Sequence, residues 1–189
     1  MKYQITPLGI DEWKDTIVPI GYTSKYYYDI EISNIQGYEI KITKKEFKYP
    51  VTHTPEEYNY PDTLFQSHRK NAQAFGVVDE DDNKKVLKAC IEFCPEEYTN
   101  RLVVTELWVS EELTRQGIGT KLINIAKEYA KQNGYRVVIL ETQSCNVRAI
   151  DFYLSQGFTL IGFDTCQFNN NDIQRHEARL NFGFFINNN

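Results

Sequence analysis

The chain has 189 residues, of which 41% are hydrophobic and 25% are charged, and its formal net charge at pH 7 is −5. This length and composition predict a single globular domain over residues 1–189 with a sizeable apolar core. The acidic balance argues against nucleic acid as a partner, because nucleic-acid binding usually requires a basic surface. It suits a cationic small molecule, although an acidic surface also serves solvation alone.

We expect neither a membrane partner nor a bound metal. The N-terminal run MKYQITPLGIDEW lacks the apolar segment of a signal peptide, and no window approaches the roughly 18 apolar residues of a membrane span. Four cysteines occur without a Cys-x-x-Cys pair, and the three histidines fall at no metal-ligand spacing. Cys90 and Cys94 would share one face of a strand as buried thiols. A cytoplasmic, reducing environment is the simplest location for unpaired cysteines.

The first part of the chain has the pattern of antiparallel strands. Residues 2–8 predict a first strand, and residues 10–20 predict a short helix. Residues 26–33 and 38–45 each alternate apolar and polar side chains around the turn Asn-Ile-Gln-Gly, which predicts a hairpin.

Three prolines then indicate an irregular segment from residue 46 to about residue 62. This segment would be either a simple connection or a part of the acceptor pocket. Residues 63–71 predict a short helix. Residues 73–79 and 85–93 alternate around the turn EDDNK, which predicts a second hairpin.

In the middle of the chain the spacing of apolar side chains changes from that of a strand to that of a helix and back. Residues 101–109, RLVVTELWV, predict a central strand buried on both faces. From residue 118 apolar side chains recur at helical spacing, and Asn133-Gly134 supplies a stop signal. Residues 135–141 predict another buried strand. Because two strands joined by a crossover helix normally pair in parallel, we expect one parallel pair here.

The end of the chain returns to short elements. Asn146 is a good cap for a helix over 147–155. Strands are predicted over 158–163 and 177–186, with a polar loop at 164–172. The whole pattern predicts an α+β fold, with a mixed, mostly antiparallel sheet, one parallel strand pair and flanking helices.

Two glycines, Gly117 and Gly119, lie at the start of the long helix. Free N–H groups and the helix dipole make such a terminus a site for a phosphate. A P-loop would need Gly-Lys-Ser/Thr, but Gly119 is followed by Thr120 and Lys121. A dinucleotide fingerprint would need a third glycine where Leu122 stands. A phosphate site of another kind or a plain turn remains.

The run from Leu107 to Phe158 resembles the signature half of the GNAT N-acetyltransferase superfamily. The family's loop pattern, Arg/Gln-x-x-Gly-x-Gly/Ala, falls on Thr114 to Gly119, with Thr114 in place of the usual first residue. The family's second signature is a strand ending in Glu, then Asn, then a helix with Ala, Phe-Tyr and a closing Gly-Phe. In this chain these are Glu141, Asn146, Ala149, Phe152-Tyr153 and Gly157-Phe158.

A narrower resemblance concerns one branch of this superfamily. The run Leu140-Glu141-Thr142-Gln143, followed by Asn146 and then by Gly157-Phe158 and Asp164-Thr165, is similar to streptothricin acetyltransferases. That branch acetylates a cationic, peptide-like antibiotic. Residues 1–100 contain no motif that tests this resemblance.

The family resemblance implies acetyl-CoA as co-substrate and a primary amine as acceptor. The amine would belong to a small cationic substrate, or alternatively to a protein N-terminus or lysine. A non-catalytic acyl-CoA-binding module is the alternative from another class, and the departure at Thr114 favours it. Residues 1–100 would form the acceptor side and residues 101–163 the cofactor-binding core. The sequence leaves a homodimer open.

The resemblance also implies the cofactor contacts. The carbonyl of the thioester would accept a hydrogen bond from the N–H of Val109, in a role like that of an oxyanion hole. The pantetheine arm would pair with Leu107, Trp108 and Val109 as a short extra strand. The remaining contacts would come from Thr114, Arg115, Gln116, Gly117, Ile118, Gly119, Thr120 and Asn146.

Amide formation needs a base for the attacking amine and an acid for the leaving thiolate. The resemblance places the base on a central strand, as Glu106 or Glu141, and the acid on the following helix, as Tyr153. A tyrosine phenol, with a reference pKa of about 10, is a slightly weaker acid than a thiol of about 8.5, so it is not ionised at neutral pH and carries the proton that the thiolate needs.

Each of these residues also has a purely structural explanation. Glu106 could pair with a buried basic group, and Glu141 could accept a structural hydrogen bond. Tyr153 could be a core residue, and Asn146 could be only a helix cap. Cys145 beside it could be an inert thiol.

Overall fold

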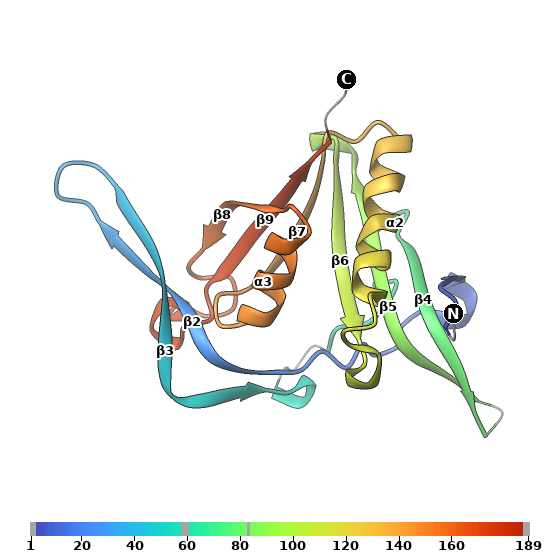
Figure 1. Cartoon of the computed structure of the whole chain (residues 1–189). Helices are drawn as coiled ribbons and strands as arrows, with labels where there is room; N and C mark the ends of the chain where they lie inside the picture. The colour runs from blue at the N-terminus through green and yellow to red at the C-terminus, as the bar shows by residue number, and fades with distance from the viewer. Residues whose placement is uncertain (1–2, 58–60, 83, 187–189) are drawn as a thin grey trace. The chain divides into compact units, whose positions relative to one another are not determined.

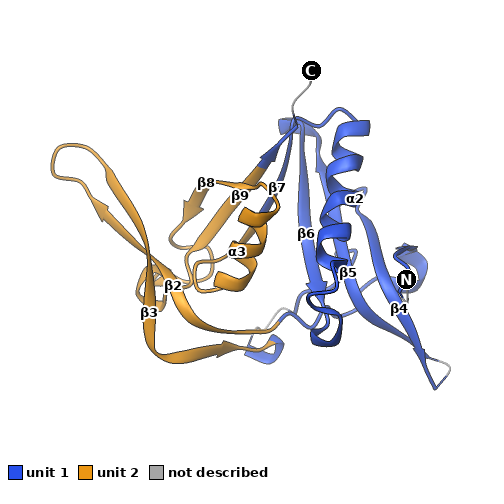
Figure 2. Cartoon of the chain, in the orientation of Figure 1, with its two compact units in different colours: residues 1–20, 55–140, 184–189 blue, residues 21–54, 141–183 orange. Residues whose placement is uncertain are grey.

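The structure is a computed structural model that describes residues 3–57, 61–82 and 84–186. The chain forms two compact units that interleave in sequence (Figure 2). Unit 1 comprises the described parts of residues 1–20, 55–140 and 184–189, and unit 2 comprises residues 21–54 and 141–183. The single domain predicted over residues 1–189 stays a prediction.

Unit 1 is built on a sheet in which the strands follow the order β1-β4-β5-β6-β7. Neighbouring strands are antiparallel except β6 and β7, which are parallel. The last residues of β7, from Glu141, belong to unit 2. The predicted parallel pair is confirmed. The strands span Thr6–Leu8 (β1), Gln73–Asp81 (β4), Lys84–Glu96 (β5), Arg101–Val109 (β6) and Val137–Gln143 (β7).

Helix α2, Ile118–Gln132, lies along β5 and β6 (Figure 1). It ends at Asn133-Gly134, where Gly134 takes a φ of 74°. This left-handed conformation favours glycine and ends a helix. The helix predicted from residue 118 is therefore confirmed. Its buried side chains recur at helical spacing and are Ile118, Leu122, Ile123, Ala126 and Ala130.

The centre of the unit 1 sheet is β5 rather than β6. Every side chain of β5 from Ala89 to Phe93 is buried. In β6 only alternate residues from Leu102 to Glu106 are buried, and those between them are half-buried. The burial on both faces predicted for residues 101–109 is therefore wrong, and it is β5, between β4 and β6 in the sheet, that is buried on both faces.

Strand β6 contains a bulge. Glu92 of β5 pairs with Glu106, but the next residue, Phe93, pairs with Val104, so Thr105 is the extra residue. A bulge changes the direction of the neighbouring side chains, and bulges recur beside active sites.

Unit 2 contains a long hairpin, the strands β8 and β9 and two helices. The hairpin strands are β2, Tyr22–Ser33, and β3, Glu39–His53, which confirms and lengthens the predicted hairpin. The sheet strands follow the order β7-β9-β8, and β8 and β9 are antiparallel. Helix α3 has its predicted bounds. The remaining elements are α3 (Val147–Ser155), β8 (Thr159–Asp164), α4 (Asp172–Arg175) and β9 (Arg179–Phe185), whose last residues belong to unit 1.

Two predictions near the N-terminus are too long. The strand predicted over 2–8 is confined, among the described residues, to the three residues of β1. The helix predicted over 10–20 is confined to α1, Ile10–Trp13. Asp15 takes a φ of 60°, a left-handed conformation that a helix cannot continue through.

The helix predicted over 63–71 is wrong. Phe65 and Asn71 have φ values of 54° and 58°, and the segment forms turns. The N–H of Leu64 donates to the carbonyl of Thr16 at 3.0 Å, so the backbone here bonds to a distant segment instead of to itself. Tertiary contacts override the weak helical preference of this stretch.

The irregular segment predicted over 46–62 is wrong in its first part, because β3 continues to His53. Pro50 lies between the paired residues Glu46 and Val51, where the ladder with β2 is interrupted. Proline is tolerated at such an interruption because its missing N–H leaves no ladder bond unmade. Residues 58–60 lie outside the described residues.

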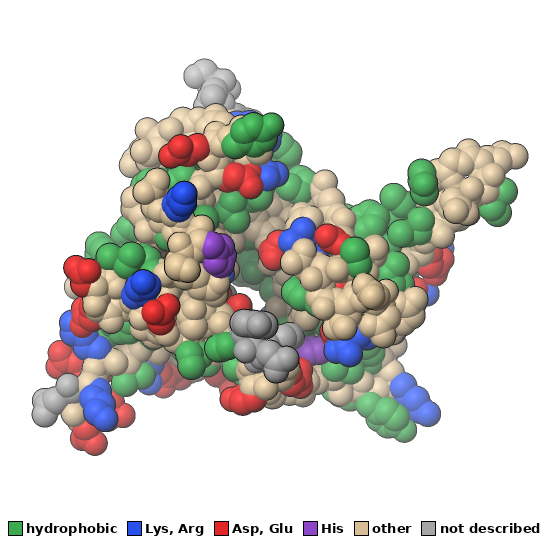
Figure 3. Space-filling model, turned by 180° about the vertical axis from the view of Figure 1, so that it is seen from behind, with side chains coloured by type: hydrophobic (Ala, Val, Ile, Leu, Met, Phe, Trp, Pro, Cys, Tyr) green, Lys and Arg blue, Asp and Glu red, His purple; other side chains and the backbone are tan. Residues whose placement is uncertain are grey.

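The surface carries charges of both signs. On the face seen in Figure 3, acidic and basic side chains are interspersed. The tip of the β2–β3 hairpin exposes two apolar side chains, Ile35 at 89% and Tyr38 at 83%. None of the described helices is long and apolar enough to cross a membrane.

A close approach of β4 to β5 leads to a stability prediction. A Cβ added at Gly76 would lie 2.5 Å from the carbonyl oxygen of Ala89 and 3.0 Å from Leu8 Cδ1. Since a backbone atom cannot move aside cheaply, Gly76→Ala should lower the free energy of unfolding by about 1–3 kcal/mol, measured by urea denaturation. Gly162→Ala on β8 is the matched control, because its Cβ would meet only Asn181 Nδ2 at 3.8 Å. Equal stability of the two variants would contradict the close approach.

Candidate functional site

Strand β6 carries the predicted reactive segment along a partly free edge. Its parallel ladder joins only Arg101–Val103 to Val137–Ile139 of β7. From Val104 to Val109, β5 is the one described strand that pairs with β6. The backbone groups on the other edge of Leu107–Val109 can therefore accept an extended ligand as a further strand.

Beyond β6 the chain passes through the short 3-10 turn Glu111–Leu113 into α2. Gly117 is the N-cap with a φ of 76°, and it makes no side-chain cap bond. The first-turn N–H groups, on Ile118, Gly119 and Thr120, therefore point toward an open helix N-terminus, which attracts anions. A Cβ at Gly117 would meet no atom within 4 Å, so access to this turn is unobstructed.

The side chains before Gly117 divide into two groups. Thr114 Oγ1 donates to the Glu111 carbonyl at 2.8 Å, and Gln116 Nε2 donates to the Glu112 carbonyl at 2.8 Å. Both therefore stabilise the loop itself. Arg115 is exposed and takes a φ of 60°, which leaves it as the cationic side chain of the loop.

Glu106 lies in a buried charged cluster of unit 1. Its carboxyl is 2% exposed, and its Oε1 lies 2.8 Å from Nη1 of Arg69. The same Nη1 lies 2.7 Å from Oε1 of Glu92, whose side chain is fully buried. The structural alternative for Glu106, a buried basic partner, is thus confirmed, with Arg69 as that partner.

The two carboxylates differ in their hydrogen bonds. Glu92 accepts from Arg69, from Thr105 Oγ1 at 2.7 Å and from the N–H of Phe65 at 2.5 Å. Among the described residues, no hydrogen-bond donor is correctly aligned with Glu106 Oε1. Glu92 therefore has three well-aligned donors, whereas Oε1 of Glu106 lies close to the Arg69 guanidinium without such alignment.

Burial raises the pKa of Glu106 to about 8. The negative charges of Asp62 and Glu92 act in the same direction, and the guanidinium of Arg69 opposes them. A carboxyl with a pKa near working pH can both hold and release a proton, which is the requirement for a general base.

Unit 2 holds the residues of the second signature. The Asn146 side chain caps α3 by accepting from the N–H of Ala149 at 3.3 Å, so its predicted cap role is confirmed. Tyr153 on α3 is 8% exposed, and its ring packs against Phe158 and Phe182 with centroid distances of 6.3 and 6.1 Å. Tyr153 therefore also contributes to the core.

Glu141, which lies two residues before the end of β7 rather than at its end as predicted, has a structural partner as well. Its Oε2 lies 2.9 Å from Nη1 of Arg179, and its side chain is 51% exposed. Arg179 also lies 3.7 Å from Asp164. Glu141 is thus a solvated ion-pair partner, in contrast to the buried Glu106.

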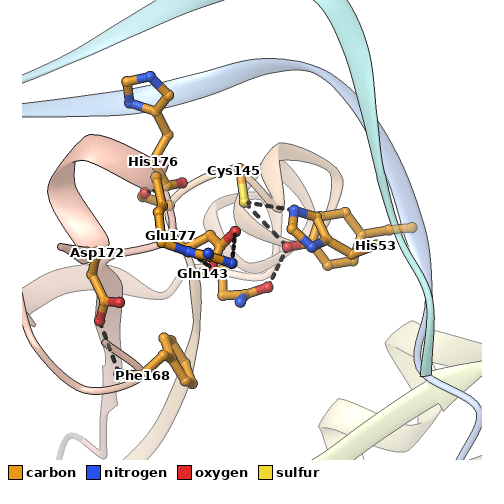
Figure 4. Close-up of polar contacts among 10 residues, drawn as sticks. His53, Gln143, Cys145, Phe168, Asp172, His176 and Glu177 are labelled. Carbon is orange, nitrogen blue, oxygen red and sulfur yellow. Dashed lines mark hydrogen bonds and ion pairs between the residues drawn. The ribbon is translucent and has the colours of Figure 1, made fainter. Parts of the chain in front are cut away.

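Cys145 belongs to a buried polar group in unit 2 (Figure 4). Its Sγ lies 3.2 Å from the hydroxyl of Tyr22 and 3.7 Å from Nε2 of His53. Tyr22 also donates to Gln143, on β7. Burial raises the pKa of the Cys145 thiol to about 11, so it stays protonated at neutral pH. An inert thiol, as the sequence suggested, agrees with this environment.

Unit 1 brings together Glu106, the Leu107–Val109 edge and the glycine loop, and unit 2 holds Glu141, Asn146 and Tyr153. Sequence reasoning missed Arg69 and Glu92. Glu92 had a signal, because a charge inside the apolar run of β5 must find a partner if it is buried. Arg69 had none, since only tertiary structure places it beside β5.

No cluster of three or more His, Cys, Asp or Glu side chains suited to a metal occurs among the described residues. The four cysteines are free thiols. The chemistry that this arrangement supports is proton transfer at Glu106 and anion binding at α2.

Comparisons with known proteins give matches in both sequence and structure. The family model described as the acetyltransferase (GNAT) family matches residues 39–158. Streptothricin acetyltransferase A of Bacillus subtilis (strain 168) is 32% identical over 68 residues, which are 36% of this chain and 39% of that protein. Human N-acetyltransferase 8 is 37% identical over 62 residues, which are 33% of this chain and 27% of that protein. The match thus spans less than half the length of either curated relative.

Two solved structures share the fold over nearly the whole chain. A nourseothricin acetyltransferase has a TM-score of 0.73 at 20% identity and covers 98% of this chain and 99% of its own. A putative streptothricin acetyltransferase from Bacillus anthracis str. Ames, in complex with acetyl coenzyme A, has a TM-score of 0.70 at 20% identity, covering 99% of both chains. These confirm the predicted α+β fold. Because the family model matches more than half of the residues, the chain belongs to the acetyltransferase (GNAT) family.

Proposed function

We propose that the chain is an N-acetyltransferase that transfers the acetyl group of acetyl-CoA to a primary amine of a small cationic substrate, such as a streptothricin-like antibiotic. The observation that carries the proposal lies within unit 1. The free edge of β6 leads, through the turn Glu111–Leu113, to the N-terminus of α2, whose N-cap Gly117 makes no side-chain hydrogen bond. An extended arm that ends in a pyrophosphate matches both features.

In this proposal the first turn of α2 holds the pyrophosphate through its N–H groups, with Arg115 as the added positive charge. Thr114 and Gln116 contribute by holding the loop rather than through direct side-chain contacts. The edge of Leu107–Val109 pairs with the pantetheine arm, and the Val109 N–H polarises the thioester carbonyl. Asn146 adds a contact while it caps α3.

Two side chains move protons in the proposed reaction. Glu106 accepts a proton from the attacking amine, directly or through one water, because only the neutral amine has a lone pair. Tyr153 donates a proton to the sulfur of the leaving thiolate and becomes a phenolate; with a reference pKa of about 10, a phenol still carries this proton at neutral pH. The environment favours Glu106 over Glu141 as the base, because burial raises its pKa to about 8 while Glu141 is exposed and paired with Arg179.

Two further observations, one from sequence similarity and one from net charge, support a small cationic amine as the acceptor. Sequence similarity includes a streptothricin acetyltransferase, and the chain carries a net charge of −5. A negative potential attracts a cationic substrate.

A thiol-release assay with acetyl-CoA and a panel of amines tests the function. We expect turnover with streptothricin-like or other small cationic amines. Acetylation of lysine or N-terminal peptides alone would favour a protein acetyltransferase. Tight acetyl-CoA binding without turnover of any amine or peptide would identify a non-catalytic acyl-CoA-binding module instead.

Tyr153→Phe tests the proposed acid. The ring and its packing stay while the hydroxyl is lost, so kcat should fall by about 10²-fold or more while the melting temperature changes little. Phe152→Leu, which alters the neighbouring residue on α3 and keeps the hydroxyl, is the control. An unchanged kcat in Tyr153→Phe would remove Tyr153 from the mechanism.

A pair of matched variants decides between the two candidate bases. Glu106→Gln should lower kcat by about 10²-fold or more, because the amide cannot accept the proton. Glu141→Gln should stay near the parent rate, because it loses only a solvated ion pair with Arg179. Steady-state kinetics with one acceptor amine gives both values, and the opposite ranking would make Glu141 the base.

A further inference from the structure

Arg69 is shared between two buried carboxylates, and the sharing is unequal. Its Nη1 donates to the Thr63 carbonyl at 3.2 Å and to Glu92 Oε1 at 2.7 Å. A guanidinium Nη carries two hydrogens, so both are used by these acceptors. Glu106 Oε1, 2.8 Å from the same nitrogen, gains its charge but no aligned hydrogen.

Glu92 determines this arrangement because it is fully anchored. It is 0% exposed and accepts three hydrogen bonds, from Arg69, Thr105 and Phe65. The β6 bulge supplies one of these donors, because it allows Thr105 to reach Glu92 from the position next to Glu106. Glu92 also pairs directly across the ladder with Glu106.

The charge balance of the cluster is one cation against several acids. The segment before β4 contributes Asp62 and Arg69, β5 contributes Glu92, and β6 contributes Glu106. Cys90 of β5 also faces the carboxylates, and burial raises the pKa of its thiol, so it stays neutral. A single guanidinium cannot neutralise two buried carboxylates, so the carboxylate with fewer donors binds a proton more readily.

We propose that Glu92 and Arg69 are positioning residues for the transfer reaction: Glu92 holds the guanidinium so that its hydrogens point away from Glu106, which makes Glu106 the proton-accepting carboxylate of the pair. This inference rests on the proposed function, in which Glu106 is the base. The same logic separates the roles of acid pairs in other active sites, where environments make one carboxylate a fixed anion and the other a proton carrier.

Glu92→Gln tests the proposal, because glutamine has the same size and its one oxygen can still accept from the N–H of Phe65, while its NH2 group replaces the Oε1 that accepts from Arg69. The variant should free an Arg69 hydrogen for Glu106 and remove a neighbouring negative charge. The acid limb of the kcat/KM profile, measured with one acceptor amine, should move to lower pH by about one unit or more, with an unchanged plateau at high pH. At a pH below the acid limbs of both the parent and the variant, a shift of one pH unit raises kcat/KM by about tenfold.

A second measurement follows the titration of the Glu106 carboxyl directly, without any turnover of substrate. In protein labelled with ¹³C-glutamate, the Glu106 carboxyl signal is assigned by its loss in Glu106→Gln. Its titration midpoint should lie near 8 in the parent and at least about one unit lower in Glu92→Gln. Adding Arg69→Gln to the Glu92→Gln variant should move the midpoint up again, because the cation is gone. This double variant also avoids leaving Glu92 as an uncompensated buried charge.

Glu96→Gln is the matched control. Glu96 also lies on β5 and pairs with an arginine, Arg101, whose Nε is 2.6 Å from Glu96 Oε2. Its loss should leave both the acid limb and the Glu106 midpoint in place. Equal shifts in Glu96→Gln and Glu92→Gln would overturn the proposal.

The outcomes separate this proposal from the proposed function. If the parent acetylates amines but neither readout moves in Glu92→Gln, the positioning role is overturned and the function stands. If the carboxyl midpoint moves and the acid limb does not, Glu106 is not the base and the positioning role is also overturned. If the parent turns over no amine or peptide, the proposed function is overturned, and the positioning role in catalysis is overturned with it.

Discussion

The parallel pairing of β6 with β7 is the constraint on which the arrangement of unit 1 depends. Parallel neighbours cannot be joined by a tight turn, so the chain must cross over the sheet before the second strand begins. Here the crossover is α2, which starts soon after β6 ends at Val109. The N-terminus of α2 therefore follows directly on the carboxyl end of a central strand, which is where ligands of sheets with parallel strands usually bind.

The parallel ladder between β6 and β7 is also short, and this leaves one edge of the later part of β6 open to a ligand. Pairing ends at Val103–Ile139, and β6 continues to Val109 with one described neighbour. A longer ladder would have used the backbone groups of Leu107–Val109 internally. The free edge and the uncapped helix together supply backbone N–H groups at fixed positions, which is how a scaffold recognises an extended anionic ligand with few charged side chains.

The buried charges of unit 1 are costly to keep and so constrain its polar contacts. Taking Glu92 and Glu106 out of water is unfavourable unless each finds compensation. Glu92 is compensated by three donors, while Glu106 receives only part of the charge of Arg69. The difference between two adjacent carboxylates on paired strands thus arises from hydrogen-bond geometry, since both are almost completely buried.

The sequence alone determined the elements with strong local signals. The 3.6-residue period from Ile118, the cap at Asn146 and the apolar run of β7 depend on nearby residues, and the structure agrees with them. Short segments with weak signals failed: residues 63–71 form turns instead of a helix, and β3 runs through Pro50. The partner of Glu106 was decided only by tertiary structure, because Arg69 and Glu106 are far apart in the chain. Local physics determines helices, caps and glycine turns, whereas the protonation of a buried carboxylate depends on charges that folding brings together.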